Sequence, residues 1–184
     1  TKILPVLQVL ENGDPETEGF SYVDRDGVLS NLIGVSQPLT GVGYYEKAKE
    51  TKQPVISNMS YLEVIKSYII PTIVPILSDS GEMTGAIMFS ITPDTLSKIS
   101  SEIKVADTGY GSIVSAEGVY FAAPDASRIG KTMEEFAAGE AEKQAYQTIL
   151  ADKEGTVTYR AAGGAENVAY FAQVPGTGWK LIVT

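Results

Sequence analysis

The feature that most constrains the fold is an order of elements that occurs twice. Residues 20–32 have the pattern of a strand, an acid-glycine turn and a returning strand, and residues 113–122 repeat it about 91 residues later. Asp-Gly between β-rich runs is a strong hairpin signal. Each copy continues with a loop, a helical stretch and three more strands, which end in hairpins at 73–91 and 168–184. The repeat predicts an α+β fold of two tandem modules, each a five-stranded antiparallel sheet with flanking helices.

The same pattern predicts the domain boundaries. We expect the end of a helix and a turn at 1–18, the first module at 19–92, a connecting helix at 93–105 and the second module at 106–184. Thr92 as N-cap and Pro93 at the first helical position favour a helix start there. A further helix is expected over 133–150, and Gly139 is a residue at which it can divide.

Composition argues against several classes of function. With 14 basic and 23 acidic residues the net charge is −9, which repels phosphate, so we expect no nucleic-acid partner. The chain has no cysteine and no histidine, so thiolate metal sites and the commonest general base are missing. Paired carboxylates such as Glu63 with Asp79 or Glu82 would be needed for catalysis, and the latter two fall in a polar turn. We expect no enzyme activity, no cofactor and no metal site.

Two segments resemble a calcium-binding loop and a membrane span, respectively. Asp24-x-Asp26-Gly27 begins like a calcium loop, but position 12 of such a loop would be Val35 rather than Glu, which favours a simple turn. The longest apolar run, near residues 69–77, contains Pro71 and Pro75 and is too short to span a membrane.

Residues 38–91 are the best candidate for a binding site. They begin with a turn that carries Tyr44 and Tyr45, continue with a short helix at 46–52, and end in β-rich runs at 55–59, 61–77 and 83–91. Tyrosine offers both an apolar ring and a hydroxyl, so a tyrosine-rich loop against apolar strands predicts a small-molecule pocket. Tyr61 and Tyr68, seven residues apart on one expected strand, should face opposite sides of the sheet.

We expect six side chains to line this pocket. They are Tyr44, Tyr45, Tyr61, Glu63, Met88 and Ser90. Glu63 would accept an ammonium or amide group, although a solvated strand residue and, for the tyrosines, plain core packing remain alternatives. In the second half, an aromatic core of a structural module is favoured over a second pocket for Tyr110, Tyr120, Tyr170 and Trp179.

Several segments also resemble a known family. In order they are VDRDG, YYEKA followed by QPVIS, VPIL, SGEMTGAI, DTGYGSIVSAEGVYFAAP and PGTGWKLIV. Their order and spacing resemble the double Cache (dCache) sensor domain, the extracytoplasmic region of bacterial and archaeal chemoreceptors and sensor histidine kinases. The resemblance implies two PAS-like modules, a ligand in the first, membrane-distal one, and a long N-terminal helix of which residues 1–10 are the remnant. It also implies flanking transmembrane helices outside this sequence, and it leaves homodimer formation open.

The resemblance qualifies the expected ligand. Members that bind amino acids use an Arg-x-Trp-Tyr segment, in which the guanidinium grips the ligand carboxylate. Tyr44 and Tyr45 keep the aromatic pair, but the Arg position falls on Val42 and a later Asp position falls on Ser90. The resemblance therefore implies a sensor for a small molecule other than a standard amino acid held by an Arg clamp. A ligand-free structural or protein-interaction module that receives a partner protein is the alternative.

Overall fold

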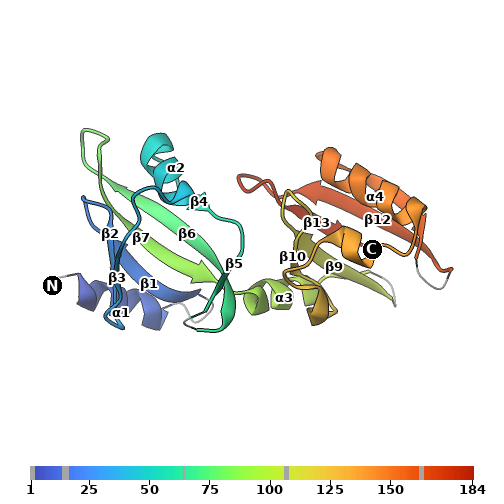
Figure 1. The fold of residues 1–184 in the computed structure, drawn as a ribbon, viewed down its shortest axis with the longest axis horizontal. Coiled ribbons are helices and arrows are strands. Elements are labelled where there is room, and N and C mark those ends of the chain that lie inside the picture. Colours follow the sequence, from blue (N-terminus) through green and yellow to red (C-terminus); the bar gives the residue numbers. More distant parts are fainter. Residues whose placement is uncertain (1–2, 14–16, 64, 106–107, 162–163) are drawn as a thin grey trace. The chain divides into compact units, whose positions relative to one another are not determined.

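The computed structural model describes residues 3–13, 17–63, 65–105, 108–161 and 164–184. The chain divides into two compact units, residues 1–92 and 93–184, and each unit is built on its own antiparallel sheet (Figure 1). The division lies at Pro93, where the connecting helix is expected to begin. Within the described residues, no helix has both the length and the apolar character needed to cross a membrane.

The first unit has two helices and seven strands among its described residues. They are α1 (Leu4–Gly13), β1 (Thr17–Val23), β2 (Val28–Asn31), β3 (Ser36–Pro38), α2 (Gly43–Thr51), β4 (Val55–Ile56), β5 (Ser60–Leu62), β6 (Ser67–Leu77) and β7 (Met83–Ile91). The sheet order is β3-β2-β1-β7-β6-β4, and β5 pairs with β6. Helix α2 packs against β4 and β6.

The second unit repeats this arrangement. Its elements are α3 (Pro93–Ser101), β8 (Lys104–Val105), β9 (Gly109–Val114), β10 (Tyr120–Ala122), the 3₁₀ helices η1 (Ala126–Arg128) and η2 (Met133–Phe136), α4 (Glu140–Ala151), β11 (Glu154–Arg160), β12 (Glu166–Gln173) and β13 (Lys180–Val183). The order β10-β9-β13-β12 corresponds to β2-β1-β7-β6, and α4 packs on β11 as α2 packs on β4. The expected helix at 133–150 divides at Gly139, whose backbone is fully extended.

The α+β class and the two antiparallel sheets are confirmed, but the strand number is not. The sheets have seven and six strands over the described residues instead of five. The three additions are β3, β5 and β8, which have two or three residues each and are too short to leave a periodic pattern in the sequence.

The run at 61–77 is a second correction, because it forms two strands instead of one. Lys66 has a φ of +49° and donates its backbone N–H to the carbonyl of Glu63, which turns the chain between β5 and β6. Tyr61 therefore lies directly opposite Tyr68 in the strand pair, and their rings meet edge to face at 5.1 Å. The expectation that they face opposite sides of one strand was wrong.

The repeat extends to the hydrogen bonds of its turns. The Asp24 carboxylate accepts from the backbone N–H groups two and four residues later, at 3.0 and 2.9 Å. The Ser115 hydroxyl oxygen accepts from the equivalent groups at 3.1 and 3.2 Å. Gly27 and Gly118 complete the turns with a φ of +81°, a conformation that favours glycine. The Asp24 carboxylate thus supports a hairpin turn, as expected.

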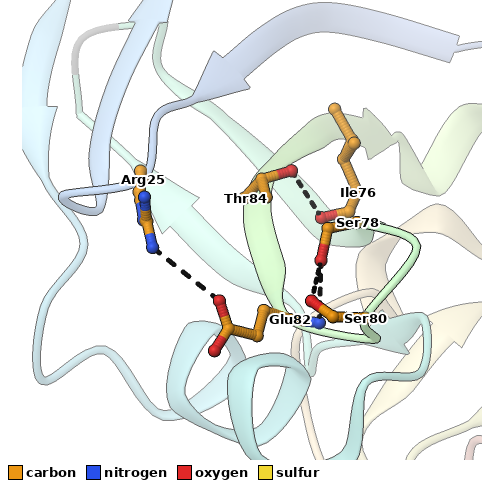
Figure 2. Close-up of polar contacts among 6 residues, drawn as sticks. All are labelled: Arg25, Ile76, Ser78, Ser80, Glu82 and Thr84. Atoms are coloured by element: carbon orange, nitrogen blue, oxygen red, sulfur yellow. Dashed lines mark hydrogen bonds and ion pairs between the residues drawn. The ribbon is translucent and has the colours of Figure 1, made fainter.

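The turn between β6 and β7 is built in the same way (Figure 2). The Ser78 hydroxyl oxygen accepts from the backbone N–H of Glu82 at 3.2 Å. It also lies 2.8 Å from the hydroxyl oxygen of Ser80. The Glu82 carboxylate lies 3.8 Å from the guanidinium of Arg25 in the β1–β2 turn, and both side chains are more than two thirds exposed. Glu82 is therefore a solvated surface partner, without the burial that a catalytic acid needs.

Candidate functional site

The tyrosine pair of the first unit lies on helix α2, not in a turn before it. The helix begins at Gly43 because Val42 is extended and the Glu46 carboxylate accepts from the N–H of Gly41 at 2.8 Å. The negative charge of Glu46 in the first turn also favours this helix start, which is earlier than the apolar pattern indicated. Tyr44 and Tyr45 consequently point in different directions around the helix.

Tyr45 and Met88 belong to one packed cluster between α2 and the sheet. Tyr45 is 3% exposed and Met88 8% exposed, and the cluster also includes Val23 and Ile73. A methyl group placed on Gly27 would lie 2.9 Å from the Tyr45 hydroxyl, so this ring reaches the β1–β2 turn. Tyr44 packs against the cluster from its edge, and burial raises the pKa of its hydroxyl.

The other expected residues are not part of this cluster. Tyr61 is 47% exposed, and Glu63 is exposed at the turn after β5. Ser90 is buried on β7, opposite Pro71 on β6, and shares a strand face with Met88. The structure thus brings Tyr44, Tyr45 and Met88 together and leaves Tyr61 and Glu63 at the surface.

The second unit contains a polar cavity at the equivalent place, lined by residues of α4 and of the sheet. Its volume is about 160 Å³. The residues that line it are Tyr110, Ser112, Tyr120, Arg128, Met133, Phe136, Glu142, Tyr146, Ile149, Tyr159, Ala161, Asn167, Ile182 and Thr184. In the strand registers, Met88 and Ser90 of β7 correspond to the cavity residues Ile182 and Thr184. The expected site and the cavity therefore occupy the same position in the two copies of the repeat.

Glu142 is the acidic group of the cavity. It is 6% exposed and projects from the first turn of α4. Its carboxylate accepts from the backbone N–H of Ala138 at 2.8 Å and from the Tyr146 hydroxyl at 2.5 Å. These two hydrogen bonds fix the position of the carboxylate at the first turn of the helix.

Aromatic hydroxyls surround this carboxylate. Tyr146 and Tyr159 meet edge to face at 5.9 Å, and Tyr120 meets Phe136 at 6.2 Å. Burial raises the pKa of Tyr146 well above its ordinary value, and the hydrogen bond to Glu142 raises it further. Burial also raises the pKa of Tyr159, and that of Tyr120 despite the hydrogen bond from Arg128. These hydroxyls therefore remain protonated donors at neutral pH.

Arg128 is the basic group. Its guanidinium donates to the Tyr120 hydroxyl at 3.3 Å and stacks 4.8 Å from the centre of the Phe136 ring. The Asp125 carboxylate lies 3.9 Å from the Nε of Arg128, and the Arg128 side chain is 32% exposed. A neighbouring pocket of about 200 Å³ shares Tyr110, Ser112, Tyr120 and Arg128 with the cavity. Arg128 thus stands where the cavity continues toward the surface.

Part of this cavity was not predicted from the sequence. Among the four aromatic residues expected to form a structural core, Trp179 does so, with its ring 5.0 Å from Phe121. Tyr120 also belongs to the buried core and lines the cavity as well, Tyr110 lines the cavity, and Tyr170 is 58% exposed. The missed cavity residues include Arg128, Glu142, Tyr146, Tyr159 and Asn167. The available signal was a carboxylate at 142 on the helix face of Tyr146 and Ile149, a spacing that otherwise marks buried apolar positions.

In the described part of the chain, no three acidic, histidine or cysteine side chains stand close enough to hold a metal ion. The cavity offers hydrogen-bond donors, one carboxylate and one guanidinium, a set suited to binding a small polar molecule.

Comparison with known proteins establishes the family. The family model described as Cache domain matches residues 5–184. The chain belongs to the Cache domain family. The resemblance seen in the sequence segments is thereby confirmed. No curated protein sequence matches the chain significantly.

Solved structures share the Cache fold at low sequence identity. An extracellular ligand-binding receptor from Desulfohalobium retbaense has a TM-score of 0.77 and 20% identity, covering 100% of this chain and 33% of the receptor. The extracellular domain of a protein assigned as a histidine kinase, mmHK1S-Z3, has a TM-score of 0.72 and 18% identity. The match covers 97% of this chain and 76% of that domain. The ligand-binding domain of the Pseudomonas aeruginosa amino acid chemoreceptor PctC, in complex with GABA, has a TM-score of 0.67 and 16% identity. The match covers 92% of this chain and 74% of that domain.

Proposed function

We propose that the chain is the extracytoplasmic small-molecule sensing region of a transmembrane signalling protein, either a chemoreceptor or a sensor histidine kinase. The observation that carries the proposal is the Cache match over residues 5–184. The similar structures support it, because they are extracellular or ligand-binding domains of receptors and of an assigned kinase. Flanking membrane helices would lie outside the sequence described above, and catalysis has no part in the proposal.

We place the ligand of the first unit between α2 and strands β6 and β7, as the resemblance to the double Cache family implies. Tyr44 supports this location, because it is half-buried beside the cluster of Tyr45 and Met88 and carries a hydroxyl. Val42 occupies the position of the family's carboxylate-binding arginine. The first-unit ligand is therefore proposed to be uncharged or cationic, since no arginine is available at that position to bind a carboxylate.

Signalling in this proposal follows from a shift between conformations. A ligand changes the population of a conformation only if it binds that conformation more tightly than the other. Helix α2 is the element whose position a ligand beside Tyr44 would change, and it packs directly on β4 and β6. A ligand here would therefore shift the position of α2 on the first sheet.

A thermal-unfolding screen against amines, nucleobases, amino acids and organic acids tests the proposal. Ligand at 100 times its dissociation constant stabilises the native state by about 2.7 kcal/mol, a shift that is readily measured. We expect a saturable shift with one chemical class that is weakened in Tyr44→Ala and kept in Tyr170→Ala, a substitution at an exposed ring. A folded chain that no compound stabilises would favour the ligand-free interaction module.

A further inference from the structure

We propose that the second unit has its own ligand site in the cavity beneath α4, and that this site takes a small zwitterion. The carboxylate of the zwitterion would lie at Arg128 and its ammonium group at Glu142. This inference goes beyond the proposed function, because it concerns a separate site with a different charge pattern from the first unit.

The size of the cavity suits a molecule of this kind. An apolar cavity of about 150 Å³ in another protein holds benzene, which has six heavy atoms. The volume here is about 160 Å³, and the neighbouring pocket adds space on the side of Arg128. A ligand of about six to eight heavy atoms would fill it.

The polar groups are more numerous than internal packing requires. The Glu142 carboxylate has about four lone-pair directions, and its two hydrogen bonds use half of them. Arg128 has five N–H donors, of which one bonds to the Tyr120 hydroxyl and one faces Asp125. Both groups line the cavity and can form further hydrogen bonds with a ligand.

Charge complementarity decides between ligand classes. Among the described residues, Glu142 forms no ion pair with a basic side chain, and the acidic partner of Arg128 is the surface residue Asp125. A simple carboxylate would meet the buried negative charge of Glu142, and a simple amine would meet the positive charge of Arg128. A zwitterion pairs with both groups and leaves no charge buried without a partner.

The rings add to the attraction for an ammonium group. Tyr146 and Tyr159 are packed edge to face beside Glu142, and their rings line the same cavity. An ammonium group is attracted to an aromatic face, and the attraction is stronger when the group is desolvated. The ammonium end is therefore expected at the closed, Glu142 side, and the carboxylate at the more exposed Arg128 side.

Calorimetric titration with a matched series tests the inference. The probes are the ω-amino acids from glycine to 5-aminopentanoate, each compared with the carboxylate and the amine of the same carbon chain. We expect at least one zwitterion to bind at least tenfold more tightly than both of its matched compounds. Arg128→Gln and Glu142→Gln should each weaken it at least tenfold, Arg128→Lys should weaken it less than Arg128→Gln, and Tyr44→Ala should not change it.

Other outcomes would overturn the inference. They are equal binding of the matched carboxylate or amine, unchanged affinity in a folded Arg128→Gln variant, and no binding in the series. If the Glu142→Gln variant fails to fold, the affinity of the Arg128→Gln variant decides the test, because the Arg128 side chain is partly exposed and lies outside the packed core. A screening hit that depends on Tyr44 but not on Arg128, with no binding in the series, would keep the proposed function and refute this second site.

Discussion

The buried tyrosine hydroxyls of the second unit predict a specific loss of stability at alkaline pH. In the folded chain burial raises the pKa of Tyr146 far above 10, whereas in the unfolded chain it is about 10. Above pH 10 the unfolded state loses a proton that the folded state keeps, so the free energy of unfolding falls as pH rises. The stabilisation from Tyr146 is complete below pH 10 and decreases above it.

The magnitude follows from linkage. A group that titrates near pH 10 only in the unfolded state lowers the free energy of unfolding by about 1.4 kcal/mol between pH 9 and 11. Tyr146→Phe removes this contribution and also the hydrogen bond to Glu142, which is worth about 1.5–3 kcal/mol because its acceptor is charged. The variant should therefore be less stable than wild type at pH 9, and the difference should shrink by about 1.4 kcal/mol at pH 11.

Urea unfolding followed by Trp179 fluorescence is a suitable assay. Trp179 is the one tryptophan of the chain, and it is buried in the second unit against Phe121. Ile149→Val is the control, because it lowers stability by about 0.5–1.5 kcal/mol without removing a titratable group. A difference between wild type and Tyr146→Phe that is the same at pH 9 and pH 11 would refute the argument.

Three further predictions concern stability measured by urea unfolding. Gly118→Ala should cost about 2–4 kcal/mol, because φ is +81° and the new methyl group would lie 2.9 Å from Leu150. Gly81→Ala is the control and should cost about 1 kcal/mol, because Gly81 has a similar φ but open space around it. Equal costs for the two substitutions would contradict this prediction. Ser115→Ala should cost about 1–2 kcal/mol through two lost hydrogen bonds, and a neutral result would argue against the turn described above. Ile149→Ala should cost about 2–5 kcal/mol because the side chain is buried in the second-unit core, and a cost below 1 kcal/mol would mean that the site collapses freely.

Local signals were enough to predict most of the fold. The acid-glycine turns at Asp26-Gly27 and Glu117-Gly118 identified the two hairpins, and Gly139 marked the division of the second-unit helix. The short additional strands were missed because two or three residues are too few to show the alternation of apolar and polar side chains that marks a strand. Tyr61 and Tyr68 were misplaced because the turn between them contains neither glycine nor proline, and Lys66 adopts its positive φ without a sequence signal.

The candidate site was harder to predict, because its residues are distant in sequence and come from different elements. Tyr45 and Met88 pack in one cluster, although Tyr45 lies on helix α2 and not in the expected turn, and their part in ligand binding stays a prediction. The cavity of the second unit joins Arg128, Glu142 and Tyr159, and only the folded sheet order brings these together. Aromatic residues alone did not distinguish it from an apolar core.

Residue-resolved amide hydrogen exchange, with and without a compound that stabilises the chain, tests the central claim most directly. We predict slower exchange in the helix and strands that enclose a bound small molecule. These are α2, β6 and β7 for a ligand of the first unit, and α4, β9 and β13 for a zwitterion in the second. If saturating compound slows exchange in neither group of elements, the chain does not sense small molecules in the way proposed.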